Sequence, residues 1–158
     1  MVTSSLNDRL QILASLAVLI GLIFVALEIR QSNHIAIATT EISVRDAYGS
    51  SNETVYSNPE FAALLAKARD SEAKFSDAEQ EMLEYWLARM LNIWISSEKA
   101  YNNEMISKET FDLAMDDMKW TIDTYPSLRP SLQTWSDDYP TSAKTELGRE
   151  MMRYLGEK

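Results

Sequence analysis

The chain has 158 residues, a formal net charge of −9 and no cysteine. The acidic balance argues against nucleic-acid binding, which needs a basic surface, and the lack of cysteine excludes disulfides, thiol nucleophiles and cysteine-ligated zinc or iron–sulfur sites. Scarce glycine and proline, four of each, favour an all-α protein with one compact domain beyond an apolar N-terminal run.

The apolar run over residues 10–29 follows a polar lead-in over residues 1–9. It contains no Lys, Arg or Pro and one formal charge, Glu28. About 20 helical residues at ~1.5 Å each span roughly 30 Å, the thickness of the hydrocarbon core of a bilayer. We therefore expect a transmembrane helix. A helix buried in a soluble oligomer stays open as an alternative, and so does a cleaved signal peptide, although no small-residue cleavage site follows the run.

Small side chains recur along one side of this expected helix at heptad spacing. Ala17 and Gly21 form a small-xxx-small pair, which lets two helices approach closely in lipid. Glu28 lies on the same stripe, and an arginine of a neighbouring chain is an expected partner for it. Two alternatives stay open. Glu28 reaches the lipid headgroups instead of a partner, or the small residues are simply common members of a membrane helix and form no interface. The expected interface residues are Ala14, Ala17, Gly21, Phe24, Glu28 and Arg30.

Residues 30–57 keep a helical rhythm, which predicts that the membrane helix continues as a rod. We expect it to run to about Tyr48, or past Gly49 toward Tyr56. A rod with an apolar face needs a partner that covers it. The residues expected on that face are Ile35, Ala38, Ile42, and Val44 or Arg45.

A helical bundle domain with short connections is expected over residues 58–158. Asn58, Ser76 and Ser107 are predicted N-caps, and Glu79 completes a capping box with Ser76. The predicted helices run over about 59–70, 77–102, 108–124 and 141–155, with one short helix between the prolines at 126 and 140.

No catalytic or metal-binding constellation is recognisable, and we expect no enzyme, metal or cofactor. The one histidine, His34, lacks the partners that zinc sites or catalytic triads need. Tryptophans at helical spacing favour a packed core, with a ligand pocket between helices as the alternative. The acidic clusters are interpreted as solvated faces; they comprise Asp112, Asp116 and Asp117, and Asp137 and Asp138.

The apolar run leads directly into residues 28–33, which read E-I-R-Q-S-N, and Asn58-Pro59-Glu60 and Trp94 follow downstream. In these features the chain resembles an uncharacterised bacterial family of small single-span membrane proteins, in which the N-terminal transmembrane helix ends in a similar E-I-R-Q-S/N signature. The resemblance covers most of the chain. It implies an architecture and a bacterial inner-membrane location, and it implies no catalytic residues.

The leading hypothesis is a non-enzymatic single-pass protein of the inner membrane that self-assembles or serves as a subunit or scaffold of a membrane complex. Its expected partners are membrane lipids and a second copy or another membrane protein. Arg30 and Arg45 follow the span while Arg9 precedes it, so the positive-inside rule places the C-terminal domain in the cytoplasm. The alternatives are a homo-oligomeric pore and a membrane-tethered domain that senses a ligand.

Overall fold

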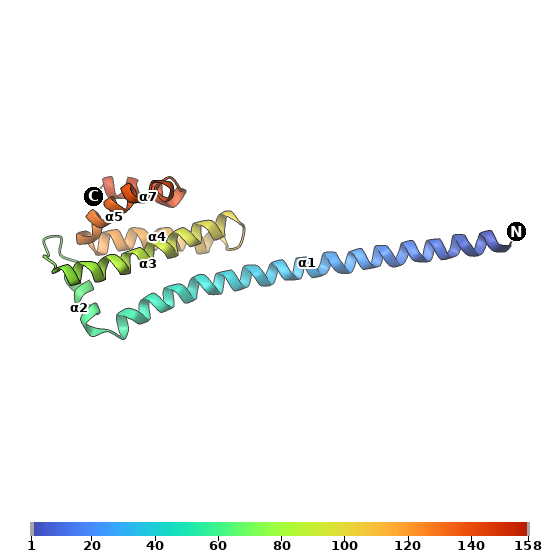
Figure 1. Cartoon of the computed structure of the whole chain (residues 1–158), viewed down its shortest axis with the longest axis horizontal. Coiled ribbons are helices and arrows are strands. Elements are labelled where there is room, and N and C mark those ends of the chain that lie inside the picture. The colour runs from blue at the N-terminus through green and yellow to red at the C-terminus, as the bar shows by residue number, and fades with distance from the viewer. Residues whose placement is uncertain (1, 158) are drawn as a thin grey trace. The chain divides into compact units, whose positions relative to one another are not determined.

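The computed structural model describes the backbone of residues 2–157 and the side chains of residues 7–157. It is all-α, with no β-strand in that range, and a long N-terminal helix precedes a bundle of shorter helices, which confirms the predicted fold class (Figure 1). The helices are α1 (Val2–Tyr56), α2 (Pro59–Lys67), α3 (Asp77–Asn102), α4 (Lys108–Thr124), the 3₁₀ helix η1 (Pro126–Leu128), α5 (Arg129–Asp138), α6 (Pro140–Ala143) and α7 (Glu146–Gly156).

Contacts divide the chain into two units, Met1–Ala38 and Thr39–Lys158. The first unit is the N-terminal part of α1, which is helical from Val2 through the stretch expected as a lead-in. The second unit contains the rest of α1 together with α2 to α7. Residues 39–56 therefore belong with the bundle, although the sequence suggested a boundary near residue 58.

The predicted N-caps are confirmed by their hydrogen bonds. The Asn58 side chain accepts from the Phe61 amide at 3.0 Å, and the Ser107 hydroxyl accepts from the Thr110 amide at 3.2 Å. Ser76 and Glu79 form the full capping box. These bonds satisfy amide groups that the first helical turn leaves unpaired, which is why α2, α3 and α4 begin where the sequence indicates.

An ion pair then joins α2 to the start of α3. Lys67 Nζ lies 2.8 Å from Glu79 Oε1, and this ammonium, with the Ser76 amide, lowers the pKa of Glu79 to about 2. The capping carboxylate is therefore charged at neutral pH, as a helix N-terminus favours.

The core of the second unit lies between α2, α3, α4 and the C-terminal helices. Trp94, Leu83, Met118 and Ile122 are fully buried in it, and Val44, Ala47, Tyr48 and Val55 of α1 pack against it. Figure 1 shows α3 and α4 side by side, and the rings of Tyr101 and Phe111 stack between them with centroids 4.9 Å apart.

The helix predicted over 141–155 is in fact two helices, α6 and α7, separated at Lys144 and Thr145. Thr145 explains the break, because its hydroxyl donates to the Ser142 carbonyl at 2.9 Å and accepts from the Gly148 amide at 3.2 Å. Gly148 lies so close to α6 that an added Cβ would stand 2.3 Å from the Ser142 oxygen. The separation thus depends on a local cap and on a close approach that only glycine allows.

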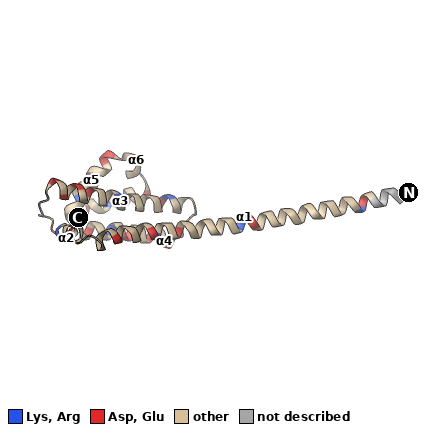
Figure 2. Ribbon diagram, turned by 60° about the horizontal axis from the view of Figure 1, so that its bottom comes forward, with Lys and Arg blue, Asp and Glu red and all other residues tan. Residues whose placement is uncertain are grey.

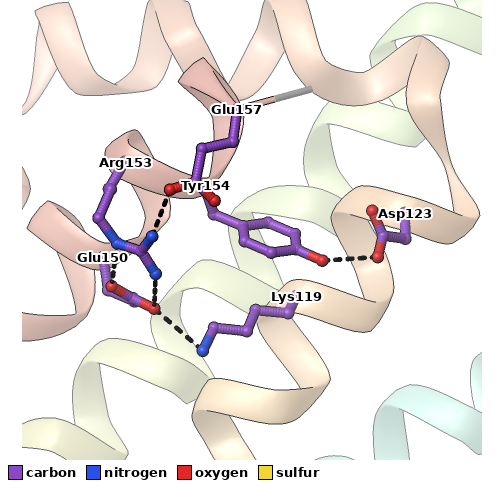
Figure 3. Close-up of polar contacts among 6 residues, drawn as sticks. All are labelled: Lys119, Asp123, Glu150, Arg153, Tyr154 and Glu157. Atoms are coloured by element: carbon purple, nitrogen blue, oxygen red, sulfur yellow. Dashed lines mark hydrogen bonds and ion pairs between the residues drawn. The ribbon is translucent and has the colours of Figure 1, made fainter.

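Polar contacts fix α7 against α4 and within itself (Figure 3). Glu150 accepts from Lys119 at 3.0 Å and from Arg153 at 2.7 Å, and the two cations lower the pKa of Glu150 to about 2. The Tyr154 hydroxyl donates to Asp123 at 2.7 Å.

The N-terminus of α7 is held by a buried side chain from α3. Glu98 is 4 % exposed; its Oε1 accepts from the Glu146 amide at 2.7 Å, and its Oε2 accepts from the Leu147 amide at 3.3 Å. A carboxylate in this position satisfies two unpaired amides and faces the positive end of the helix dipole.

Candidate functional site

The apolar run over 10–29 has the dimensions of a membrane span and is left uncovered by the chain. The 18-residue window of highest hydropathy in α1 reaches a mean of 2.7 and has none of its residues buried. Large apolar side chains that a soluble domain would bury are exposed here; for example, Ile20 is 46 % exposed and Ile12 is 67 % exposed. The helix is therefore long and apolar enough to cross a membrane, and it is not a core helix of this fold.

Charge is sparse along the same unit, as Figure 2 shows. Only Asp8, Arg9, Glu28 and Arg30 are charged among residues 1–38, and these four charges cancel. The whole net charge of −9 is therefore carried by the second unit.

The expected interface stripe lies on the open surface of this helix. Ala14, Ala17, Gly21, Phe24 and Glu28 are all exposed, and an added Cβ at Gly21 would meet no described atom within 4 Å. Packing within the chain therefore gives no reason for a residue as small as glycine at that position.

Arg30 does not share that side of the helix. It follows Glu28 by two residues, a rotation of about 200° at 3.6 residues per turn, and it is exposed. In a parallel pair of helices that met along the stripe, Arg30 would point away from the partner's Glu28.

The part of α1 that belongs to the second unit packs on the bundle through a face that shares only Val44 with the predicted apolar stripe. Ile35 and Ile42 are 59 % and 58 % exposed, whereas Val44, Ala47 and Tyr48 pack on the core. Val44 of the predicted stripe packs on the bundle, and the two isoleucines are left uncovered, so a covering partner for them stays a prediction. The packed face also carries Glu41, whose carboxylate accepts from the Ser107 amide at 3.0 Å, and such polar members hide its periodicity in the sequence.

One member of the predicted solvated acidic faces is instead part of the bundle. Asp117 is half-buried, its Oδ2 accepts from the Trp94 indole at 2.7 Å, and burial raises its pKa. Burial and the nearby Asp117 charge also raise the pKa of the Tyr48 hydroxyl. This cluster joins α1, α3 and α4. Asp112 and Asp116 are exposed as expected, and Asp112 pairs with Lys108.

Trp94 belongs to the core and Trp86 and Trp135 pack against it, whereas Trp120 is 54 % exposed. Trp94 is fully buried, and Trp86 packs edge-on against Phe61 and Tyr125, with ring centroids 6.4 Å and 5.5 Å apart. Trp86 also lines a small hollow of about 270 Å³. Within the part of the chain that the structure describes, no three His, Cys, Asp or Glu side chains are grouped as metal ligands.

A larger groove of about 580 Å³ runs between residues 40–47 of α1 and residues 85–100 of α3. The sequence did not predict this groove, because its walls come from segments that lie 38 to 60 residues apart in the chain. The only local sign is three small residues of α3, Ala88, Ser96 and Ala100, which share one face with Asn92, and alanine and serine at such positions are common in a surface helix. Arg89 and Tyr85 line both the groove and the hollow beside Trp86.

Comparison of the chain with protein-family models, with curated proteins and with solved structures finds no match in any of the three.

Proposed function

We propose that this protein is a non-enzymatic, single-pass protein of a bacterial inner membrane that self-assembles there or serves as a scaffold subunit of a membrane complex. One observation carries the proposal: residues 10–29 are apolar and uncovered, while the second unit completes its core without them. A helix apolar on all sides and buried by nothing needs lipid as its solvent.

Assembly is proposed along the stripe of Ala14, Ala17, Gly21, Phe24 and Glu28. Apolar side chains gain nothing by leaving lipid for one another, so helices associate in a bilayer through close backbone contact at small residues. Gly21 supports this role, because the space around it is open and the chain itself places no neighbour there.

Replacing Gly21 with Leu is expected to dissociate the oligomer into monomers, because the branched side chain would hold the two helix backbones apart. The measurement is the protein mass in mild detergent by light scattering. Ile20→Leu, one residue away but outside the stripe, is the matched control and should leave the mass unchanged. An unaltered mass for Gly21→Leu would remove the stripe from the proposal.

We propose further that the second unit lies in the cytoplasm. The support is the arginine balance, with Arg30 and Arg45 after the run and Arg9 before it, together with the preference of cytoplasmic flanks for positive charge.

A reporter fused after residue 158 tests this orientation. Green fluorescent protein should fluoresce there, whereas alkaline phosphatase, which needs the oxidising periplasm, should stay inactive. The reverse pattern would place the second unit in the periplasm.

A further inference from the structure

The surface of the groove between α1 and α3 is mostly apolar, with Thr40, Ser43 and Asn92 as polar members of its lining, and the groove belongs to one compact unit. Val44, Ala47 and Ile93 contribute to its walls, and Ala88, Ser96 and Ala100 are small residues of α3 that leave it hollow. Its volume of about 580 Å³ lies within the range of ~300–1,000 Å³ typical of ligand sites. Its α3 wall runs from Tyr85 to Ala100, a rise of ~22 Å at ~1.5 Å per residue.

Arg89 supplies a positive charge at one end of this groove. The unit around it carries a net charge of −9, yet none of the ion pairs found among the described residues includes Arg89. Its Nη2 donates to the Ser50 hydroxyl at 2.7 Å, which orients the side chain beside the groove. The other guanidinium N–H groups remain for an anion.

We propose that this groove binds a long-chain fatty acid, with the acyl chain along the apolar walls and the carboxylate on Arg89. The inference goes beyond the proposed anchoring and does not require it.

The length and chemistry of the groove fit this ligand. An acyl chain of one leaflet covers about half of a ~30 Å hydrocarbon core, ~15 Å. The α3 wall beyond Arg89 extends to Ala100, which is ~16 Å at ~1.5 Å per residue, so it accommodates the chain. Each methylene removed from water contributes ~0.8 kcal/mol, and the planar guanidinium binds a carboxylate through two parallel hydrogen bonds. Tyr85, 71 % exposed beside Arg89, offers an apolar ring and a hydroxyl at the same end.

The absence of cysteine from the sequence allows a direct test with the full chain in phosphatidylcholine nanodiscs. Ser96→Cys places a single thiol in the groove, and its rate of reaction with a maleimide is measured with and without palmitate at a pH that ionises the acid. Palmitate should slow the reaction at least fivefold. Hexadecanol, which has the same chain without the charge, should need about ten times more ligand for equal protection.

Matched variants separate the site from partition into lipid. Ser71→Cys, in the exposed turn after α2, should react at one rate regardless of palmitate. Adding Arg89→Gln to Ser96→Cys should abolish the preference for palmitate over hexadecanol, and adding Arg69→Gln, an exposed arginine away from the groove, should preserve it.

Three results would overturn the inference. Palmitate could fail to protect the thiol, hexadecanol could protect it equally well, or the thiol could be unreactive and form an interchain disulfide, which would make a second copy the occupant. A chain that proved soluble without lipid would refute the anchoring while leaving this assay to run in plain buffer.

Discussion

Replacing Leu19 and Ile20 together with Arg should remove the protein from the membrane fraction. The run over 10–29 has thirteen Leu, Ile, Phe and Val residues, and each contributes roughly −0.3 to −0.6 kcal/mol to insertion, or about −4 to −8 kcal/mol in all. Two central arginines cost about +5 to +7 kcal/mol. The eleven apolar residues that remain contribute about −3 to −7 kcal/mol, so insertion would change from favourable to near balance or unfavourable, and carbonate-washed membranes should retain well under half of the protein.

The exchange Leu19→Ile with Ile20→Leu is the matched control, because it keeps the hydropathy and should keep the protein in the washed membranes. The four tryptophans lie in the second unit, so their emission reports whether the bundle still folds in both variants. Equal membrane retention of the arginine variant and the control, with the bundle folded, would contradict lipid as the solvent of this helix.

The helix starts could be read from the sequence because their determinants are local. Ser76 and Glu79 lie three residues apart and bond to each other's backbone amides, so nothing distant is needed to place the start of α3. Asn58 and Ser107 act over the same distance. The helical spacing of the tryptophans likewise predicted that Trp86 and Trp94 of α3 belong to the packed core.

Contacts between distant residues could not be read in this way. The face of α1 that packs on the bundle is set by partners such as Met90, whose sulfur accepts from the Ser51 hydroxyl across 39 residues. Ile35 and Ile42 have the better apolar spacing and yet stay exposed. Spacing identifies a stripe, but it does not say whether the bundle or another molecule covers it.

The candidate sites differ in the same way, because one depends on local spacing and the other on contacts between distant residues. The stripe from Ala14 to Glu28 follows from spacing within one helix, so the sequence was enough to propose it. The groove needs Arg89 of α3 beside Ser50 of α1, and neither residue carries a motif. Glu98 was missed for the same reason, because a glutamate inside α3 resembles any solvated residue until α7 is placed against it.

Replacing Glu98 with Ala should destabilise the second unit by about 2–4 kcal/mol. The change removes the acceptors of the Glu146 and Leu147 amides. The buried Leu147 N–H left without a partner costs about 1–3 kcal/mol, and the loss of the part-buried Glu146 bond adds about 1 kcal/mol. Leu147 is fully buried, so water does not readily replace the lost bonds. The melting temperature, followed by tryptophan emission of the full chain in detergent, should fall by about 10 °C.

Two further variants decide whether the effect comes from the α7 amides. Glu81→Ala removes an exposed carboxylate from the same helix and should change stability by less than about 0.5 kcal/mol. Glu98→Gln keeps one acceptor oxygen but turns an NH₂ group toward the second amide, so its loss should lie between those of the two alanine variants. If Glu98→Ala melted at the same temperature as Glu81→Ala, the buried carboxylate would not be what holds α7 on α3. The position of α7 would then depend on the core contacts of Leu147 and Met151 alone.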